Sequence, residues 1–447
     1  MRDERGVDVE DSQAIVIDTD WSYEAVAARR RQFMAPSVAT FTAYEQPLVL
    51  NRGEGQYLWD QTGKRYLDCL AQNLTISVGH NHPLVSSEAR KQLDGMQHCT
   101  TMYYHPVPVH HAEELVARMP SGHDWVVHFT NSGAEAVDLA VLMARAHTGN
   151  FEIVALRNSF HGLHSTAMAT TGMAVCRQPV PVPGGVLHVS NPDQYRGMHG
   201  ATVAPYVEEI DRLIQSSTPG AIAGFLVEPI QGYGGVIPVP EGYLPAAFAR
   251  AREAGGVCIV DEVQTGFARM GTNFFAFDDH GVVPDIVVLG KGISNGFPLS
   301  AVIARREIAE AMAHRKFFNT YAANPVSCAA GRAVLRAIDA EDLLGNARRV
   351  GALMMRDLRA LQQKYDIIGD VRGQGLMIGV DLVRDRRSKE PAVAETVRLF
   401  ERTKELGLVV GKSGIHGNLL RISPPLCIQE SDVEFFTEVL DSSFASL

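Results

Sequence analysis

The 447-residue sequence predicts an α/β fold. A large domain is expected to carry a mainly parallel, doubly wound sheet, and a smaller α+β domain is expected to form from both ends of the chain. The first observation is that short runs alternate with helix-like segments between about residues 86 and 325. The second is that these runs are apolar, as are strands buried on both faces of a parallel sheet. They are Trp125–Phe129, Glu152–Leu156, Ala223–Val227, Val257–Val260 and Ile286–Leu289.

The two ends of the chain follow other patterns. Residues 1–35 are polar and then helical from Tyr23 to Phe33, which predicts an arm, and residues 46–68 predict a β-meander. A long amphipathic helix at Pro325–Asp339 leads into a second α+β unit. Its expected strands are Ile367–Arg372, Gly375–Leu382, Leu408–Gly411 and Leu419–Ser423. We therefore predict an arm and part of the small domain in residues 1–85, the large domain in 86–325 and the rest of the small domain in 326–447.

Composition excludes several classes of partner. A net charge of −10 gives no basic footprint for nucleic acid or an anionic membrane. The six cysteines have neither disulfide-framework nor zinc spacing, so we expect no metal site and a reducing compartment. The N-terminus lacks the apolar core of a signal peptide, and no run of about 18 apolar residues occurs. We expect a cytoplasmic protein that acts on small molecules.

Asp261 and Lys291 each end one of the apolar runs, where ligand sites of open α/β sheets lie. Buried charges need a partner or a ligand. A lysine for a Schiff base and an acid facing a pyridinium nitrogen are what pyridoxal phosphate requires. The plain alternatives are that Asp261 caps a helix or pairs with an arginine, and that Lys291 is a solvated loop residue.

Further candidates follow the other runs, and each has a structural alternative. The small residues Ser132, Gly133 and Ala134 open a helix and could cradle a phosphate, or Ser132 could simply cap that helix. Phe160 could stack on a ring, or belong to the core. The remaining candidates are His161, Glu228 as a second carboxylate, Thr320 as a phosphate hydroxyl and Arg421 as a carboxylate clamp. Ordinary core, capping and surface roles are their alternatives.

These segments, in this order, resemble the class III (ω-amino acid) aminotransferases, a fold type I pyridoxal phosphate family. The resemblance extends from about Leu48 to Cys427. It rests on the segments GHNHP at 79–83, NSGAEA at 131–136, DEVQTGF at 261–267, GKGISNGFP at 290–298 and VRGQGL at 371–376.

The resemblance implies roles for individual residues. Lys291 is the expected Schiff-base lysine, and Asp261, supported by Glu228, is the expected partner of the pyridinium nitrogen. The expected cofactor contacts are Ser132, Gly133 and Ala134 at the phosphate, Phe160, His161 and Val263 around the ring, and Gln264 at the ring oxygen. Tyr103 and Arg421 are the expected substrate contacts. In the family Thr320 reaches the neighbouring subunit's phosphate, which implies an obligate homodimer and leaves a tetramer open.

The substrate is less defined. In the ornithine and 4-aminobutyrate enzymes of this family, a glutamate follows the segment that corresponds to EPIQG at 228–232. Tyr233 follows that segment here, so those substrates are disfavoured. Thr75–His80 and Met102–Pro106 resemble alanine–glyoxylate aminotransferases, whereas segments near residues 319–328 and 414–418 resemble ethanolamine-phosphate phospho-lyases. Arg421 favours a transaminase that uses a 2-oxo acid such as glyoxylate or pyruvate. A phospho-lyase, with Lys412, His416 and Arg421 binding a second phosphate, is the alternative, and a catalytically silent cofactor-binding protein is a third.

Overall fold

The computed structural model describes residues 22–447 and divides into two compact units. One unit comprises the described residues up to Arg52 together with Trp59–Lys64, and the other comprises Gly53–Leu58 and Arg65–Leu447. In the first unit, α1 (Tyr23–Phe33) confirms the helix predicted there, and α2 (Pro36–Ala39) follows it. The Ala25 N–H donates to Ser22 Oγ and caps α1 (3.3 Å). The part of the predicted arm before residue 22 lies outside the described residues.

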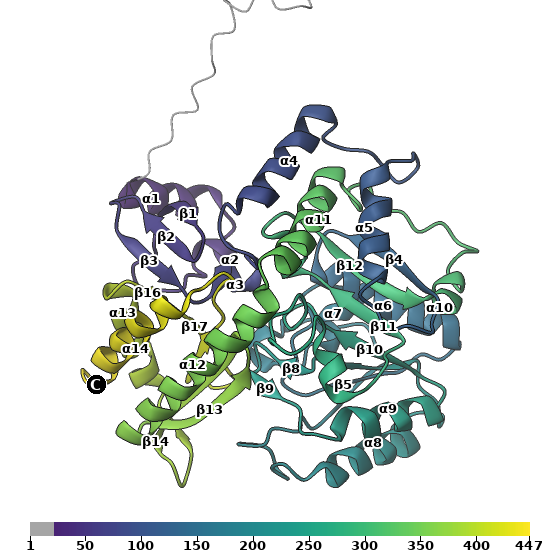
Figure 1. Ribbon diagram of the computed structural model, residues 1–447. Coiled ribbons are helices and arrows are strands. Elements are labelled where there is room, and N and C mark those ends of the chain that lie inside the picture. Colours follow the sequence, from purple (N-terminus) through teal and green to yellow (C-terminus); the bar gives the residue numbers. More distant parts are fainter. Residues whose placement is uncertain (1–21) are drawn as a thin grey trace, which may run out of the picture. The chain divides into compact units, whose positions relative to one another are not determined.

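The large sheet has seven strands in the order β4-β12-β11-β10-β7-β5-β6 (Figure 1). β12 runs antiparallel to both of its neighbours, β4 and β11, and all other pairs are parallel, so the mainly parallel sheet is confirmed. The strands are β4 (Trp125–Thr130), β5 (Ile153–Leu156), β6 (Val186–Val189), β7 (Gly224–Val227), β10 (Val257–Asp261), β11 (Ile286–Leu289) and β12 (Ser300–Arg305). The sequence analysis did not identify β6 or β12.

Helices cover both faces of this sheet, which confirms the doubly wound arrangement. α6 (Gly133–Thr148) packs its apolar side on the face that presents Leu226 and Ile259. Alternate residues point the other way. Phe225 therefore meets Phe248 of α9 (Tyr243–Glu253) on the opposite face, with ring centroids 6.4 Å apart. The other helices of this part are α4 (Pro83–Gly95), α5 (Pro106–Val116), α7 (Ser165–Thr170), α8 (Val203–Ser217), α10 (Arg306–Glu310) and α11 (Pro325–Ala340).

The C-terminal part is an antiparallel sheet in the order β13-β14-β18-β17, packed with helices (Figure 1). Its elements are β13 (Ile368–Gln374), β14 (Met377–Asp385), β15 (Glu390–Pro391), β17 (Gly411–Ser413), β18 (Leu419–Ile422), α12 (Leu343–Lys364), α13 (Val393–Glu405) and α14 (Glu430–Phe444). β16 (Leu408–Val409) pairs in parallel with β3 (Arg65–Asp68), so segments from both chain ends meet here. The domain boundaries near residues 85 and 325 remain a prediction.

One strand prediction in this part was wrong, and another was wrong at its start. Leu408–Gly411 is not one strand, because β16 pairs with β3 whereas β17 pairs with β18. The strand predicted at Gly375–Leu382 begins two residues later, as β14 at Met377, because Gly375 has a φ of +53° and lies in the turn between β13 and β14. The predicted meander appears as three short strands, β1 (Leu50–Glu54), β2 (Tyr57–Asp60) and β3.

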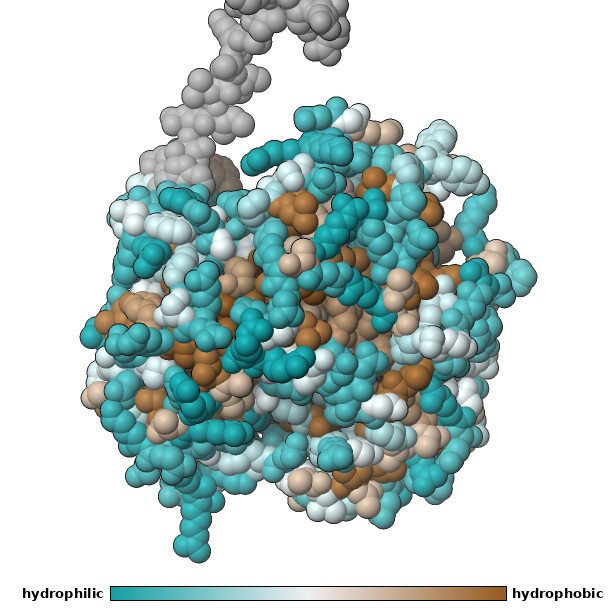
Figure 2. Space-filling model, in the orientation of Figure 1, coloured by the Kyte–Doolittle hydropathy of each residue, from teal (hydrophilic) through white to brown (hydrophobic). Residues whose placement is uncertain are grey.

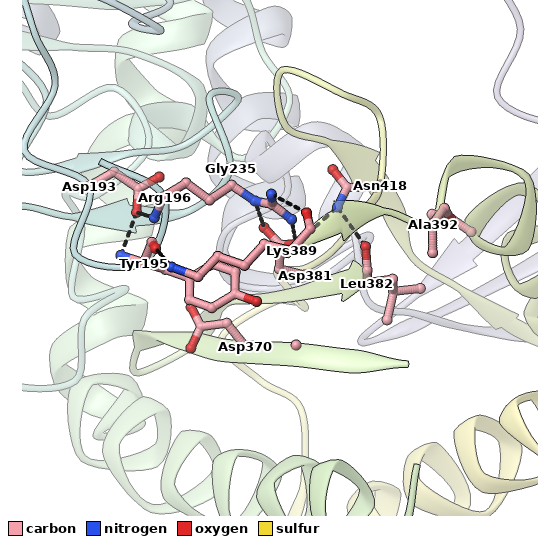
Figure 3. Close-up of polar contacts among 12 residues, drawn as sticks. Asp193, Tyr195, Arg196, Gly235, Asp370, Asp381, Leu382, Lys389, Ala392 and Asn418 are labelled. Atoms are coloured by element: carbon pink, nitrogen blue, oxygen red, sulfur yellow. Dashed lines mark hydrogen bonds and ion pairs between the residues drawn. The ribbon is translucent and has the colours of Figure 1, made fainter. Parts of the chain in front are cut away.

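Buried ion pairs join strand β14 to the segment between β6 and α8 (Figure 3). Asp381 of β14 is 2% exposed and accepts from Arg196 at both oxygens (3.0 and 2.5 Å) and from Asn418 (2.9 Å). Arg372 of β13 lies 3.3 Å from the same carboxylate and donates through Nε to the carbonyls of Gly235 (3.0 Å) and Val236 (3.1 Å). The loop that follows β8 (Ile230–Gln231) and precedes β9 (Ile237–Pro238) is therefore held by the C-terminal sheet.

Candidate active site

Asp261 is the last residue of β10 and is 4% exposed. Its Oδ2 lies 2.7 Å from His161 Nδ1, and its Oδ1 accepts from the Val263 N–H (3.0 Å). His161 is also buried, and its Nε2 has no partner in the described chain. The carboxylate therefore pairs with a histidine, not with an arginine as the plain alternative supposed.

Glu228 follows β7, the strand next to β10. Its two oxygens accept from the backbone N–H groups of Phe160 and Gly232, each at 3.0 Å. Burial raises the pKa of Glu228 to about 7, and the nearby Asp261 acts in the same direction, whereas His161 lowers it. Two carboxylates thus lie close together at the carboxyl end of the sheet, as predicted.

Lys291 begins a single 3-10 turn, η3 (Lys291–Ser294), directly after β11 and has a φ of +43°. Burial lowers its pKa to about 8; Arg421 lowers it further, and Asp261 and Glu228 raise it. The reading of Lys291 as a solvated loop residue is therefore wrong. Ser77 Oγ donates to the Gly292 carbonyl (2.7 Å), and Asn295 Oδ1 accepts from the Val78 N–H (3.0 Å), which fixes this left-handed turn.

Ser132, Gly133 and Ala134 form the start of α6. The Glu135 N–H donates to Ser132 Oγ (3.3 Å), so Ser132 caps the helix as its alternative proposed, and the helix N-terminus still offers N–H groups to an anion. Two glycines allow other residues to pack closely against the N-terminal end of α6. A Cβ on Gly162 would lie 2.6 Å from Ala134 Cβ, and one on Gly133 would lie 3.4 Å from the methyl groups of Val263.

These residues fit pyridoxal phosphate. Ser132, Gly133, Ala134, Phe160, Val263 and Lys291 each keep part of their surface accessible, and they surround the buried Asp261 and Glu228. An acid after β10, an amine after β11 and a helix N-terminus after β4 match the pyridine nitrogen, the aldehyde and the phosphate of that cofactor. The Phe160 ring also meets Tyr233 edge to face, with centroids 5.4 Å apart.

Arg421 of β18 is 4% exposed and has only neutral partners. Its Nη2 donates to Asn73 Oδ1, and its Nη1 lies 3.4 Å from Gln264 Oε1. Within residues 22–447 no carboxylate forms an ion pair with it, and its Nε has no partner. Burial lowers the pKa of Arg421 to about 10. A buried guanidinium without a counter-ion favours an anionic ligand.

Two of the predicted site residues are exposed to solvent. Tyr103 is 71% exposed, and Thr320 is also exposed. The Thr320 loop is tied to the start of α6, because Asn319 Nδ2 donates to Glu135 Oε2 (2.9 Å) and Asn131 Nδ2 donates to Asn319 Oδ1 (3.0 Å). The sequence analysis missed these bonds, and it missed Asn73. The sequence signal that could have pointed to these asparagines is a polar residue within a segment of otherwise small or apolar residues.

The family model described as "Aminotransferase class-III" matches residues 40–444. The chain belongs to the class III aminotransferase family. It is a pyridoxal-phosphate-dependent aminotransferase, as the sequence predicted, and its fold is that of the fold type I enzymes. Among residues 22–447, no helix is long and apolar enough to cross a membrane, and no cluster of His, Cys, Asp and Glu could hold a metal ion.

Three similar proteins illustrate the range of this family. "Alanine–glyoxylate aminotransferase 2 homolog 2, mitochondrial" of Arabidopsis thaliana is 45% identical over 95% of this aminotransferase and 88% of its own length. An amine transaminase from an uncultivated Pseudomonas species, solved with bound pyridoxal phosphate, is 32% identical with a TM-score of 0.84, covering 92% and 97% of the two chains. A phospholyase from Arthrobacter, solved with phosphoethanolamine, is 35% identical with a TM-score of 0.86, covering 94% and 100%.

Proposed function

We propose that this aminotransferase moves an amino group from alanine or a similar amino acid to glyoxylate or a similar 2-oxo acid. The observation that carries the proposal is the buried Arg421, whose present partners are neutral amide oxygens. Amino acids and 2-oxo acids both bear the carboxylate that such a guanidinium binds by paired hydrogen bonds. The name of the Arabidopsis relative agrees with this choice.

The chain's own residues divide the work. Bound pyridoxal phosphate supplies an electron-withdrawing ring conjugated to a reactive aldehyde carbon. Lys291 Nζ takes the proton from Cα of the amino donor, and a pKa of about 8 keeps part of the amine neutral near pH 7. Asp261, oriented by His161, would pair with the ring nitrogen of the bound cofactor. We assign the remaining cofactor contacts to Ser132, Gly133, Ala134, Phe160, Val263, Gln264 and Thr320, and a substrate contact to Tyr103.

The exposed surface supports our proposal of a homodimer with shared sites. Large apolar side chains are exposed next to Thr320 and around Tyr103: Met96, Met102, Tyr104, Val109, Phe317, Phe318 and Tyr321. His98 and Tyr321 touch, with ring centroids 5.5 Å apart, so the two groups are neighbours. Figure 2 shows hydrophobic surface among hydrophilic atoms in the region of α5 and α11. Apolar patches of this kind mark protein interfaces, and a second copy would bring Thr320 and Tyr103 to its partner's site.

The phospho-lyase alternative is favoured by the Arthrobacter neighbour, but its phosphate site is incomplete. Gly411 pairs with Arg421 across β17 and β18, and Lys412 pairs with Leu420. Directly opposed residues share a face of the sheet, so Lys412 and Arg421 point to opposite faces. Lys412 Nζ lies instead over the Phe400 ring, 5.7 Å from its centroid. Lys412 therefore cannot join Arg421 and His416 around one phosphate group.

The two functions give different products. Purified protein with pyridoxal phosphate, L-alanine and glyoxylate is expected to form pyruvate and glycine in equal amounts. Phosphoethanolamine without a 2-oxo acid is expected to release no inorganic phosphate. Phosphate and acetaldehyde release, with no pyruvate from alanine, would contradict the proposal. The cytoplasmic location remains a prediction, because the Arabidopsis relative is named as mitochondrial.

A further inference from the structure

Asn73 lies in an unusual backbone segment. Ala71, Gln72, Asn73 and Leu74, the residues of α3 (Ala71–Leu74), all have positive φ, between +48° and +67°. L-residues rarely adopt this left-handed conformation in succession. Asp68 fixes the turn, because its Oδ1 accepts from the N–H groups of Leu70 and Ala71 (both 2.9 Å), while its Oδ2 lies 2.9 Å from His80 Nε2. Such constrained segments occur where a side chain must be aimed.

The turn aims Asn73 at Arg421. Ala71 and Leu74 are buried and anchor the turn, whereas Asn73 is exposed and its Oδ1 accepts from the buried Arg421 Nη2. Charged groups surround Arg421. Its positive charge lowers the pKa of Lys291 and of Arg269, and the carboxylate of Glu228 raises the pKa of Arg421. Arg269 itself donates to the backbone carbonyls of Leu376 (3.0 Å) and Pro424 (2.6 Å) and supplies no counter-charge.

We propose that Asn73 is a specificity-determining residue: its neutral amide oxygen positions Arg421 and leaves the guanidinium charge available to the carboxylate of the substrate. The proposal rests on the carboxylate role of Arg421 given above. An amide oxygen makes a weaker hydrogen bond to a guanidinium than a carboxylate does. A substrate carboxylate can therefore take over this bond, whereas a residue with its own negative charge would compete with it.

Asn73→Asp tests this directly, because it changes the charge at nearly constant shape. Donor half-reactions are followed with the holoenzyme and no 2-oxo acid, using the change in cofactor absorbance. L-Alanine is compared with L-alaninamide, in which a neutral amide replaces the carboxylate. We expect the ratio of the two second-order rate constants to fall at least about tenfold in Asn73→Asp, since an ion pair now occupies Arg421. The ratio does not depend on how much of the variant is correctly folded.

Asn73→Gly is the matched control, because glycine adopts a φ of +64° without strain and brings no charge. We expect its ratio to fall by no more than about threefold, because glycine removes one hydrogen bond to Arg421 but adds no charge that competes with the substrate. An unchanged ratio in Asn73→Asp, or equal falls in both variants, would overturn the inference while leaving the proposed function intact. Arg421→Gln separates the two: an unchanged ratio there would remove the carboxylate role of Arg421 itself, and the inference with it.

Discussion

Replacing Asp381 by asparagine should destabilise the protein and slow its reaction. Asp381 is 2% exposed and serves two guanidinium groups: Arg196 through both oxygens, and Arg372 at 3.3 Å. An asparagine keeps the shape but turns one acceptor into a donor facing Arg196. Breaking a buried pair from one side costs about 3–5 kcal/mol. The two arginine side chains keep 17% and 12% of their surface exposed, so solvent screening brings the expected loss to about 2–4 kcal/mol.

The kinetic consequence follows from Arg372. Its guanidinium holds the carbonyls of Gly235 and Val236, and Tyr233 of the same loop packs on Phe160. A guanidinium that has lost its carboxylate holds this loop less firmly, so we expect kcat to fall several-fold.

Thermal unfolding of the holoenzyme measures the stability loss, and steady-state alanine–glyoxylate turnover measures the kinetic loss. Asp366→Asn is the matched control, since Asp366 is fully exposed and lies 3.8 Å from Arg386. Solvent screens an exposed pair of this kind, so its loss should hardly change stability. If Asp381→Asn melts within a degree of Asp366→Asn, the buried pairs do not stabilise this junction and the reasoning is wrong.

Three further predictions concern the site. Lys291→Ala should abolish turnover and the covalent retention of cofactor after borohydride treatment, as judged by the mass of the protein. The rate at which the cofactor-free protein captures cofactor should rise with pH and show an inflection around 8, where Lys291 becomes neutral. Arg421→Gln should move this inflection to higher pH, because it removes a cation that lowers the pKa of Lys291. Stopped-flow absorbance measures both effects. Gly162→Ala should weaken cofactor binding and cost about 1–3 kcal/mol, since its Cβ would lie 2.6 Å from Ala134 Cβ at a φ of +125°. Gly184→Ala, which meets nothing within 4 Å, is its control in equilibrium dialysis.

Sequence patterns predicted the elements that are apolar on both faces. β10 and β11 were found because Val257–Asp261 and Ile286–Leu289 are buried at every position. β6 was missed because three of its four residues are only partly buried, so it has no continuous apolar signal. β12 was missed although it is largely buried. Its direction, antiparallel to both β11 and β4, depends on long-range pairing that no local pattern encodes.

The same limit applies to the site. Asp261, Glu228 and Lys291 were predictable because strand ends place them, and strands can be read from the sequence. The contact of Asn73 with Arg421 could not be predicted, because it depends on four consecutive residues in the left-handed conformation, which Asp68 holds in place. Alanine and leucine do not favour that conformation locally, so only the hydrogen bonds of the folded chain maintain it.

The electrostatics of the site favour proton storage on Glu228 near neutral pH. Both oxygens of Asp261 act as acceptors, for His161 and for the Val263 N–H. Glu228 accepts only backbone N–H groups, and burial together with the neighbouring Asp261 raises its pKa to about 7. Burial and the charge of Asp261 both disfavour the ionised form of Glu228, so we expect Glu228 to hold a proton in part of the molecules near pH 7. Glu228→Gln mimics that state, and it should preserve cofactor binding while lowering the pH at which Lys291 becomes neutral, because Glu228 raises the pKa of that lysine. The pH dependence of cofactor capture measures this, and an inflection that moves upwards would contradict the assignment.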